Sequence, residues 1–229
     1  MVFPRPIHAV VFDMDGLLVD TEVLIRDLMF AAAEARGARL PNEVFMRMVG
    51  LPSAASDAVA RAHFGPHFPL EAWLDEVSAG ARAACEAGVA LKVGVVELLD
   101  HLDAADIPRA VATSSSHGAV QRTLGPNGVL PRFHAIVAAG DYARGKPSPD
   151  PFLTAADRLG VSPERCLALE DSHNGVRAAH AAGMMTVMVP DLLAPTDEMR
   201  EKCVAIAESL RHVRDLIDRT AGLGTRRGL

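Results

Sequence analysis

From Lys92 onward, short apolar segments alternate with segments whose apolar residues recur at helical spacing. We expect strands at 109–112, 135–138, 166–169, 186–189 and 203–207. We expect the helices between and after them at 95–105, from about 118 onward, at 151–159, at 175–182 and at 210–219. Such alternation favours a parallel sheet that is covered by helices on both faces. The pattern therefore predicts a doubly wound, Rossmann-like α/β core.

A block of helices interrupts this alternation near the N-terminus. The apolar segment 9–12 has the length and β-branched content of a buried strand, and it belongs with the later strands. Between these strands, helical spacing predicts helices at 23–36, 42–49, 53–64 and 70–87. The helical block is thus an insertion between the first and second core strands. We divide the chain into core segments 1–19 and 91–220, an all-helical domain at 20–90 and a loose tail at 221–229.

The composition excludes several classes of protein. A net charge of −6 gives no basic surface for nucleic acid. Three widely spaced cysteines without zinc spacing are typical of reduced thiols in the cytoplasm. The first apolar segment is too brief for a signal peptide, and the longest one is interrupted by Pro190 and Asp191. We therefore expect a soluble, cytoplasmic and monomeric protein that binds neither nucleic acid nor membranes.

Two carboxylates follow the first predicted strand, at Asp13 and Asp15. Like charges this close repel each other, and a bound cation such as Mg²⁺ relieves the repulsion. Gly16 permits a tight reversal that aims both acids at one point. The alternative is that both are ordinary turn or helix-capping residues. A calcium-binding EF-hand loop is excluded, because its fifth, sixth and twelfth positions would all be leucine.

Polar side chains also follow the other predicted strands. They are Thr113 to Ser115, Asp141 to Lys146, and Glu170 with Asp171. In open parallel sheets, ligands bind beyond the carboxyl ends of the strands, so these groups should meet. Together they supply the metal ligands, the nucleophile and the donors that phosphoryl transfer needs. Residues 140–146 fit the start of a nucleotide-binding P-loop, but Pro147 follows where Ser or Thr is required.

Four motifs in this order resemble those of the haloacid dehalogenase-like (HAD) phosphohydrolases. They are Asp-Met-Asp-Gly at 13–16, Thr113 after an apolar strand, Gly-Lys-Pro-Ser-Pro-Asp at 145–150, and Leu-Glu-Asp-Ser at 169–172. The resemblance covers nearly the whole chain, and it is nearest to the branch of β-phosphoglucomutases and small phosphoglycolate or sugar-phosphate phosphatases. Members of this family carry a helical cap between the first two core strands, which is where the helical block lies here.

The resemblance implies a role for each acidic residue. Asp13 would be the nucleophile that forms an aspartyl-phosphate, with metal and donors neutralising the incoming phosphoryl group. Asp15 would protonate the leaving oxygen and then activate water, and its backbone carbonyl would face the metal. Asp171 would complete the Mg²⁺ site together with Asp13. Glu170 would bind the metal directly or hold a water that does.

The same resemblance implies how substrate is held. Thr113 would donate a hydrogen bond to a phosphoryl oxygen, and Ser114 would contribute its backbone N–H or its hydroxyl. Lys146 would neutralise the charge that the nucleophile shares with the phosphoryl group. Glu22 and Arg47 could reach substrate from the cap, and the alternative for both is a surface salt bridge.

The implied function is a Mg²⁺-dependent phosphatase for a small phosphomonoester, such as a sugar phosphate or phosphoglycolate. A phosphohexomutase is the alternative. The histidine and arginine of such mutases are replaced here by Ile25 and Ser53, although Arg47 could substitute for the arginine. A non-catalytic phospho-acceptor module is a further alternative, and Asp15, placed to activate water, argues against it. The sequence does not identify the phosphate ester.

Overall fold

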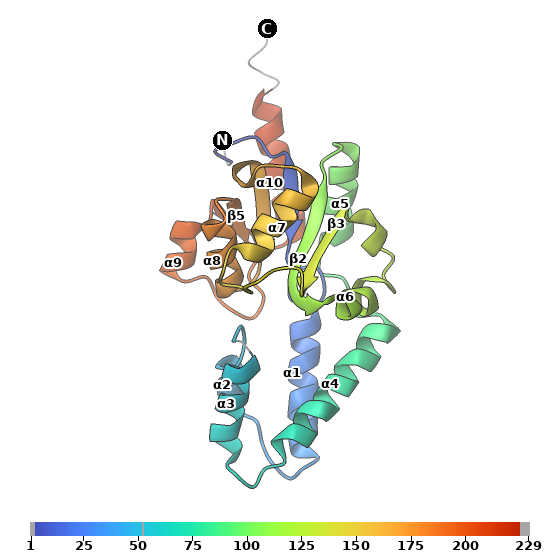
Figure 1. Ribbon diagram of the computed structural model, residues 1–229, viewed down its shortest axis with the longest axis vertical. Helices are drawn as coiled ribbons and strands as arrows, with labels where there is room; N and C mark the ends of the chain where they lie inside the picture. The colour runs from blue at the N-terminus through green and yellow to red at the C-terminus, as the bar shows by residue number, and fades with distance from the viewer. Residues whose placement is uncertain (1–2, 52, 225–229) are drawn as a thin grey trace.

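The computed structural model describes residues 3–51 and 53–224, and it contains a six-stranded, wholly parallel sheet (Figure 1). The strands are β1 (Ala9–Phe12), β2 (Arg109–Ser116), β3 (Ala135–Ala139), β4 (Cys166–Glu170), β5 (Met185–Met188) and β6 (Ala205–Ile206). Their order across the sheet is β3-β2-β1-β4-β5-β6. This is the order of a Rossmann-like sheet, and it reverses direction between β1 and β4. The predicted fold class is confirmed.

Helices cover both faces of this sheet. They are α5 (Val95–Ala104), α6 (His117–Leu124), α7 (Asp150–Leu159), α8 (His173–Ala181), α9 (Asp197–Lys202) and α10 (Leu210–Gly224), with 3-10 turns at Leu130–Arg132 and Pro163–Arg165. Along β1, Val10 and Phe12 join the apolar cluster beneath α5 and α10, whereas Ala9 and Val11 join the one beneath α7 and α8. Successive residues of a strand point to opposite faces, so β1 is buried on both.

The remaining helices form a separate layer beyond the carboxyl edge of the sheet, at the bottom of Figure 1. They are α1 (Thr21–Glu34), α2 (Asn42–Met46), α3 (Ser53–Phe64) and α4 (Leu70–Ala87). The spans of α3 and α4 are those expected from the apolar spacing, and no strand lies among the described residues between 21 and 87. These helices have their own apolar cluster around Trp73, which is fully buried.

Two chain segments join the helical layer to the sheet, and they run side by side. The backbone N–H of Asp20 donates to the carbonyl of Ala90 at 3.1 Å, and that of Lys92 donates to Leu18 at 3.0 Å. The Lys92 ammonium also lies 2.7 Å from a carboxylate oxygen of Asp191, in the loop after β5. The two connections are therefore paired, and both begin next to the carboxyl end of β1.

Several elements differ from the expected boundaries: α2 ends at Met46 instead of residue 49, and β6 is confined to Ala205–Ile206. Strand β2 continues through its polar residues to Ser116, because an irregularity in its pairing with β3 lets the ladder resume. Helix α9 was not indicated, since its six residues contain a single apolar side chain, although Thr196 caps it by accepting from the Met199 N–H at 3.3 Å. Helix α10 continues to Gly224, so the expected tail begins inside a helix, and residues 225–229 lie outside the described residues.

Among the described residues, no helix combines the length and the apolar character needed to cross a membrane.

Candidate active site

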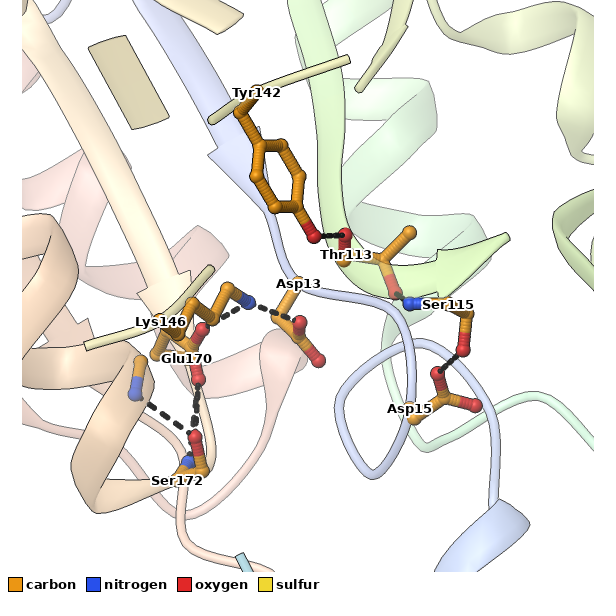
Figure 2. A network of polar contacts seen from close by, with 9 residues as sticks. Asp13, Asp15, Thr113, Ser115, Tyr142, Lys146, Glu170 and Ser172 are labelled. Atoms are coloured by element: carbon orange, nitrogen blue, oxygen red, sulfur yellow. Dashed lines mark hydrogen bonds and ion pairs between the residues drawn. The ribbon is translucent and has the colours of Figure 1, made fainter. Parts of the chain in front are cut away.

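Asp13 is the first residue after β1, at the position where the strand order reverses. Its backbone N–H donates to the carbonyl of Leu169 at 3.0 Å, which fixes it beside the end of β4. Its side chain is only 10% exposed and contacts the Lys146 ammonium. That ammonium also lies 2.5 Å from a carboxylate oxygen of Glu170, so Lys146 bridges two strand ends (Figure 2).

Burial governs the ionisation of this cluster. It raises the pKa of Asp13 to about 8, an effect that the Lys146 ammonium opposes and the neighbouring Glu170 and Asp15 carboxylates reinforce. Burial by itself would lower the pKa of Lys146, but the carboxylates of Asp13 and Glu170 outweigh it and raise that pKa. Lys146 is therefore a charged ammonium at neutral pH, held between the carboxyl groups of Asp13 and Glu170.

Three buried carboxylates meet at the same point. Oxygens of Asp13, Glu170 and Asp171 all lie within 4.8 Å of one another. The pKa of Asp171 is raised, first by its burial and then by the Asp13 carboxylate. Oxygen ligands without sulfur or nitrogen are what a hard cation such as Mg²⁺ prefers, and one lysine leaves this group with excess negative charge. The donor set therefore fits a divalent metal.

Gly16 makes room for this carboxylate cluster. Its φ of +82° belongs to the left-handed region, and a Cβ there would collide with Oδ2 of Asp171. The same Cβ would stand 3.4 Å from Oδ2 of Asp191, a buried oxygen that has no hydrogen-bond partner among the described residues. Buried oxygens left unpaired are costly, which is a second sign that a positive charge belongs near Gly16.

Asp15 is held apart from this cluster by hydroxyl groups on two elements. Its Oδ1 accepts from the Thr21 hydroxyl at 3.1 Å, at the start of α1, and its Oδ2 accepts from the Ser115 hydroxyl at 2.8 Å, on β2. Figure 2 shows Asp15 on the Ser115 side of the loop, away from Lys146. Its carboxyl group is thus oriented without a bond to the acidic cluster, an arrangement that suits a proton-transfer group.

The end of β2 supplies hydroxyl and amide groups. Thr113 is buried, and its Oγ1 accepts from the Ser115 N–H at 3.0 Å, which leaves the hydroxyl proton free to donate. The Tyr142 hydroxyl donates to the carbonyl of Thr113 at 3.0 Å and fixes this backbone (Figure 2). Thr113 and Ser114 line the same cavity as Asp13.

The loop that carries Lys146 is fixed at its start by Asp141. Asp141 accepts from the backbone N–H of Ala138 at 2.9 Å and pairs with His117 at 2.9 Å and Arg158 at 3.0 Å. These bonds, led by the one from Arg158, hold the pKa of Asp141 well below its usual range. The start of the loop is therefore held to β3, α6 and α7 by a carboxylate that stays ionised.

These groups surround a cavity of about 440 Å³ between the sheet and the helical layer. Of the predicted site residues, the cavity is lined by Asp13, Asp15, Glu22, Thr113, Ser114, Lys146 and Asp171. Glu170 is fully buried behind Lys146. Arg47 is exposed at the end of α2 and does not line the cavity. The structure thus brings together all of the predicted residues except Arg47.

Glu22 enters the site from the first turn of α1. Burial raises its pKa to about 7, and the carboxylates of Asp15 and Asp191 add to the shift. A surface salt bridge, the alternative expected for this residue, is not formed with any described residue.

Several further residues of the cavity were not among the predicted site residues. Gly50 and Leu51 belong to the loop after α2, and Asn174 of α8 donates to the carbonyl of Gly50 at 2.9 Å. Ser172 caps α8 by accepting from the Gly175 N–H at 3.1 Å, and its hydroxyl donates to Glu170. Ser172 could have been found from its place in the last motif, whereas a glycine and a leucine in a helical block give no such indication.

Comparisons with known proteins agree with this geometry. A family model described as haloacid dehalogenase-like hydrolase matches residues 7–183. A probable pseudouridine-5'-phosphatase of Drosophila melanogaster is 38% identical over 196 residues, which cover 82% of this chain and 83% of that protein. The fructose-1-phosphate phosphatase of Escherichia coli is 32% identical over 78% of this chain and 94% of its own. The structure of a putative β-phosphoglucomutase from Thermotoga maritima superposes with a TM-score of 0.79 and 26% identity, covering 93% of this chain and 99% of that one.

Proposed function

The chain belongs to the haloacid dehalogenase-like hydrolases, and from that premise we propose that it is a Mg²⁺-dependent phosphatase acting on a small phosphomonoester. The observation that carries the proposal is the convergence of Asp13, Asp15, Lys146 and Asp171 on one cavity. Two relatives with the names of sugar or nucleoside phosphate phosphatases support this substrate class.

In the first step, a carboxylate oxygen of Asp13 forms a bond to phosphorus while the bond to the leaving oxygen breaks. Asp15 gives its proton to that oxygen, so an alcohol departs and an aspartyl-phosphate remains. Thr113, Ser114 and Lys146 donate to the phosphoryl oxygens as negative charge builds on them. Asp15 lies beside the nucleophile, held by Ser115 and Thr21, so it reaches the leaving oxygen without competing for phosphorus.

In the second step, Asp15 takes a proton from a water molecule whose oxygen attacks phosphorus. The bond to Asp13 breaks, and inorganic phosphate and the free carboxylate result. Asp13, Asp171 and the backbone carbonyl of Asp15 would hold Mg²⁺, with Glu170 behind them. When bound, the metal supplies positive charge that neutralises the phosphoryl group and lowers the pKa of Asp13.

We propose that residues 20–90 form a cap on a core of residues 1–19 and 91–220. The bond from Asn174 to Gly50 joins helix α8 to the loop after α2 above the cavity. Closing the cap over substrate excludes water and completes the site. A phosphohexomutase remains the second candidate, because the family resemblance includes that branch. The exposed position of Arg47, outside the cavity, favours the phosphatase.

The test is release of inorganic phosphate from a panel of small phosphomonoesters in Mg²⁺, with EDTA as the blank. The proposal expects metal-dependent turnover that is lost in Asp13→Asn and retained in Asp157→Asn, an exposed carboxylate on α7. Disappearance of β-glucose 1-phosphate without free phosphate would establish the mutase instead. Equal turnover in Asp13→Asn and wild type would overturn the proposed nucleophile.

A further inference from the structure

A second cavity, of about 270 Å³, opens on the other side of Asp15 between helices α1, α4 and α6. Asp15 lines both cavities, so its carboxyl group stands between them. Thr21 and Ser115, which donate to the two oxygens of that carboxyl, line the second cavity as well. The first cavity holds the nucleophile and Lys146, whereas the second holds neither.

The position of Asp15 gives the second cavity a function, provided that the proposed phosphatase reaction is correct. A general acid must reach the oxygen that joins phosphorus to the leaving group. With the phosphoryl group beside Asp13, the remainder of the substrate extends past Asp15 into the second cavity. A volume slightly below that of typical ligand pockets suits a short carbon skeleton.

Two arginines face this cavity, Arg82 on α4 and Arg122 on α6. Neither guanidinium has an ion pair or hydrogen bond to another described residue. The Arg122 Nη1 atom lies 3.2 Å from where a Cβ on Gly118 would stand, so the side chain folds back to the first turn of α6. By contrast, Arg109 and Arg177 are both engaged by carboxylates.

The other walls of this cavity are mainly apolar. They comprise Leu24, Ile25, Ala81, Cys85 and Ala119. Arg82 is exposed and Arg122 is half-buried, and a guanidinium without a partner binds a carboxylate or phosphate through paired charge-assisted hydrogen bonds. The catalytic centre next to it is rich in carboxylates and would repel an anion there. Arg82 and Arg122, on the far side of Asp15, therefore offset that repulsion for an anion on the leaving group.

We propose that this cavity binds the leaving group and that Arg82 and Arg122 select substrates whose leaving group carries a second anion. The anion is a carboxylate or a second phosphate on a short carbon skeleton. The selection is for binding, so it changes KM rather than kcat. The position at which mutases carry the arginine for the far phosphate is Ser53, at the start of α3, and no described residue of α3 lines this cavity.

The experiment compares substrates that share a skeleton and differ by one anion. One pair is 3-phosphoglycerate and glycerol 3-phosphate, and the other is fructose 1,6-bisphosphate and fructose 1-phosphate. Steady-state phosphate release is measured for the wild type and for Arg82→Gln and Arg122→Gln. The lysine variants at both positions keep the charge, and Arg200→Gln is the control, because Arg200 is exposed on α9 without a side-chain partner among the described residues.

The wild type should prefer the anionic member of one pair, and that pair identifies whether the anion is carboxylate or phosphate. Each glutamine variant should raise KM for that member by about tenfold, the effect of one charge-assisted hydrogen bond. KM for the ester that lacks the second anion should change by less than about twofold. The lysine variants should recover part of the affinity that the glutamine variants lose. Equal losses on both members, or no preference in the wild type, would overturn the inference.

A binding experiment separates failure of the proposed reaction from failure of the proposed anion site. Calorimetric titration of Asp13→Asn in Mg²⁺ with the same four esters measures binding without turnover. If no ester releases phosphate from the wild type, the phosphatase proposal fails. The titration still shows whether Arg82 and Arg122 bind the second anion. Tighter binding of the anionic ester that is lost in Arg82→Gln and Arg122→Gln supports the anion site, and equal binding of all four esters contradicts it.

Discussion

The sheet and the helical layer are built on opposite principles. In the sheet, β1 is buried on both faces. The residues just after it that line the cavity, Asp13 and Asp15, are charged. In the helical layer, the buried cluster is apolar and aromatic, with Trp73 in edge contact with Phe64 and Phe68. The sheet therefore fixes reactive groups at defined points, whereas the helices provide a packed surface that covers them.

The strand ends should contribute mainly to turnover, and the helical layer mainly to stability. Buried carboxylates such as Asp13 and Asp171 have raised pKa values in the metal-free protein, so their ionised forms oppose folding. The aromatic cluster carries no such penalty. Substitutions at the strand ends should thus affect turnover first, and substitutions in the helical layer should affect stability first.

The largest expected effect is that of Asp13→Asn. An amide does not form the aspartyl-phosphate, so kcat should fall by roughly 10⁶-fold, as for other covalent nucleophiles. The apparent melting temperature in EDTA at pH 8 should rise or stay unchanged, because a carboxyl buried at a cost is removed. A lower melting temperature would mean that Asp13 also stabilises the sheet, and the contrast between the two regions would weaken.

Asp15→Asn should lower kcat by about 10²–10⁴-fold, the usual contribution of a positioned acid or base. Asp13 remains able to accept the phosphoryl group, so the variant should accumulate phosphorylated Asp13, which mass spectrometry of the intact chain detects. A variant that loses activity without any phosphorylated protein would show that the first transfer itself does not proceed without Asp15.

Trp73→Ala tests the other half of the comparison. The side chain is fully buried, and its indole N–H donates to the carbonyl of Met29 at 3.1 Å, so truncation should cost about 3–5 kcal/mol of unfolding free energy. Trp73→Phe is the matched control: it keeps an aromatic ring and loses the hydrogen bond. Urea denaturation gives both values. Comparable losses in the two variants would show that the bond, rather than the buried ring, holds the helices together.

Magnesium binding should depend on pH. Burial raises the pKa of Asp13 to about 8, well above that of the unfolded chain, and also raises that of Asp171. A group with a raised pKa stabilises the fold below its unfolded pKa, and that contribution is lost as the pH rises through the folded pKa. The metal-free protein should therefore lose stability between about pH 4 and pH 8, and Mg²⁺ should bind more tightly as the pH rises.

Thermal melting with and without Mg²⁺ at pH 5.5 and pH 8 measures this linkage. The increase in melting temperature on adding the metal should be larger at pH 8. Asp157→Asn, remote from the site, should show the same pH dependence as the wild type. An increase that does not vary with pH would mean that the acidic cluster is already ionised without metal.

The smallest expected effect is that of Arg47→Gln. Its side chain is exposed and outside the cavity, so kcat/KM should change by less than about twofold, as for most surface substitutions. Measurement on the preferred ester decides this. A loss of more than tenfold would show that α2 moves toward substrate when the cap closes, and Arg47 would then regain the role that the sequence allowed for it.

The sequence by itself determined the fold class and the strand-end residues. Strands and helices are recognised from local periodicity, and the carboxyl ends of parallel strands necessarily meet, so Asp13, Thr113, Lys146 and Asp171 could be brought together without coordinates. Short elements were less predictable. Helix α9 has a single apolar residue and leaves no clear periodic signal, whereas the two-residue β6 lies inside the strand expected at 203–207.

Only the tertiary structure decided how the helical layer meets the sheet. The bond between Ser115 and Asp15 joins residues 100 positions apart. The half-buried position of Glu22, the exposure of Arg47 and the placement of Arg82 and Arg122 around one cavity depend equally on the angle at which helices leave a paired linker. Periodicity reports which face of a helix is apolar, but not which distant side chains that helix will face, because that orientation is set by packing across the whole molecule.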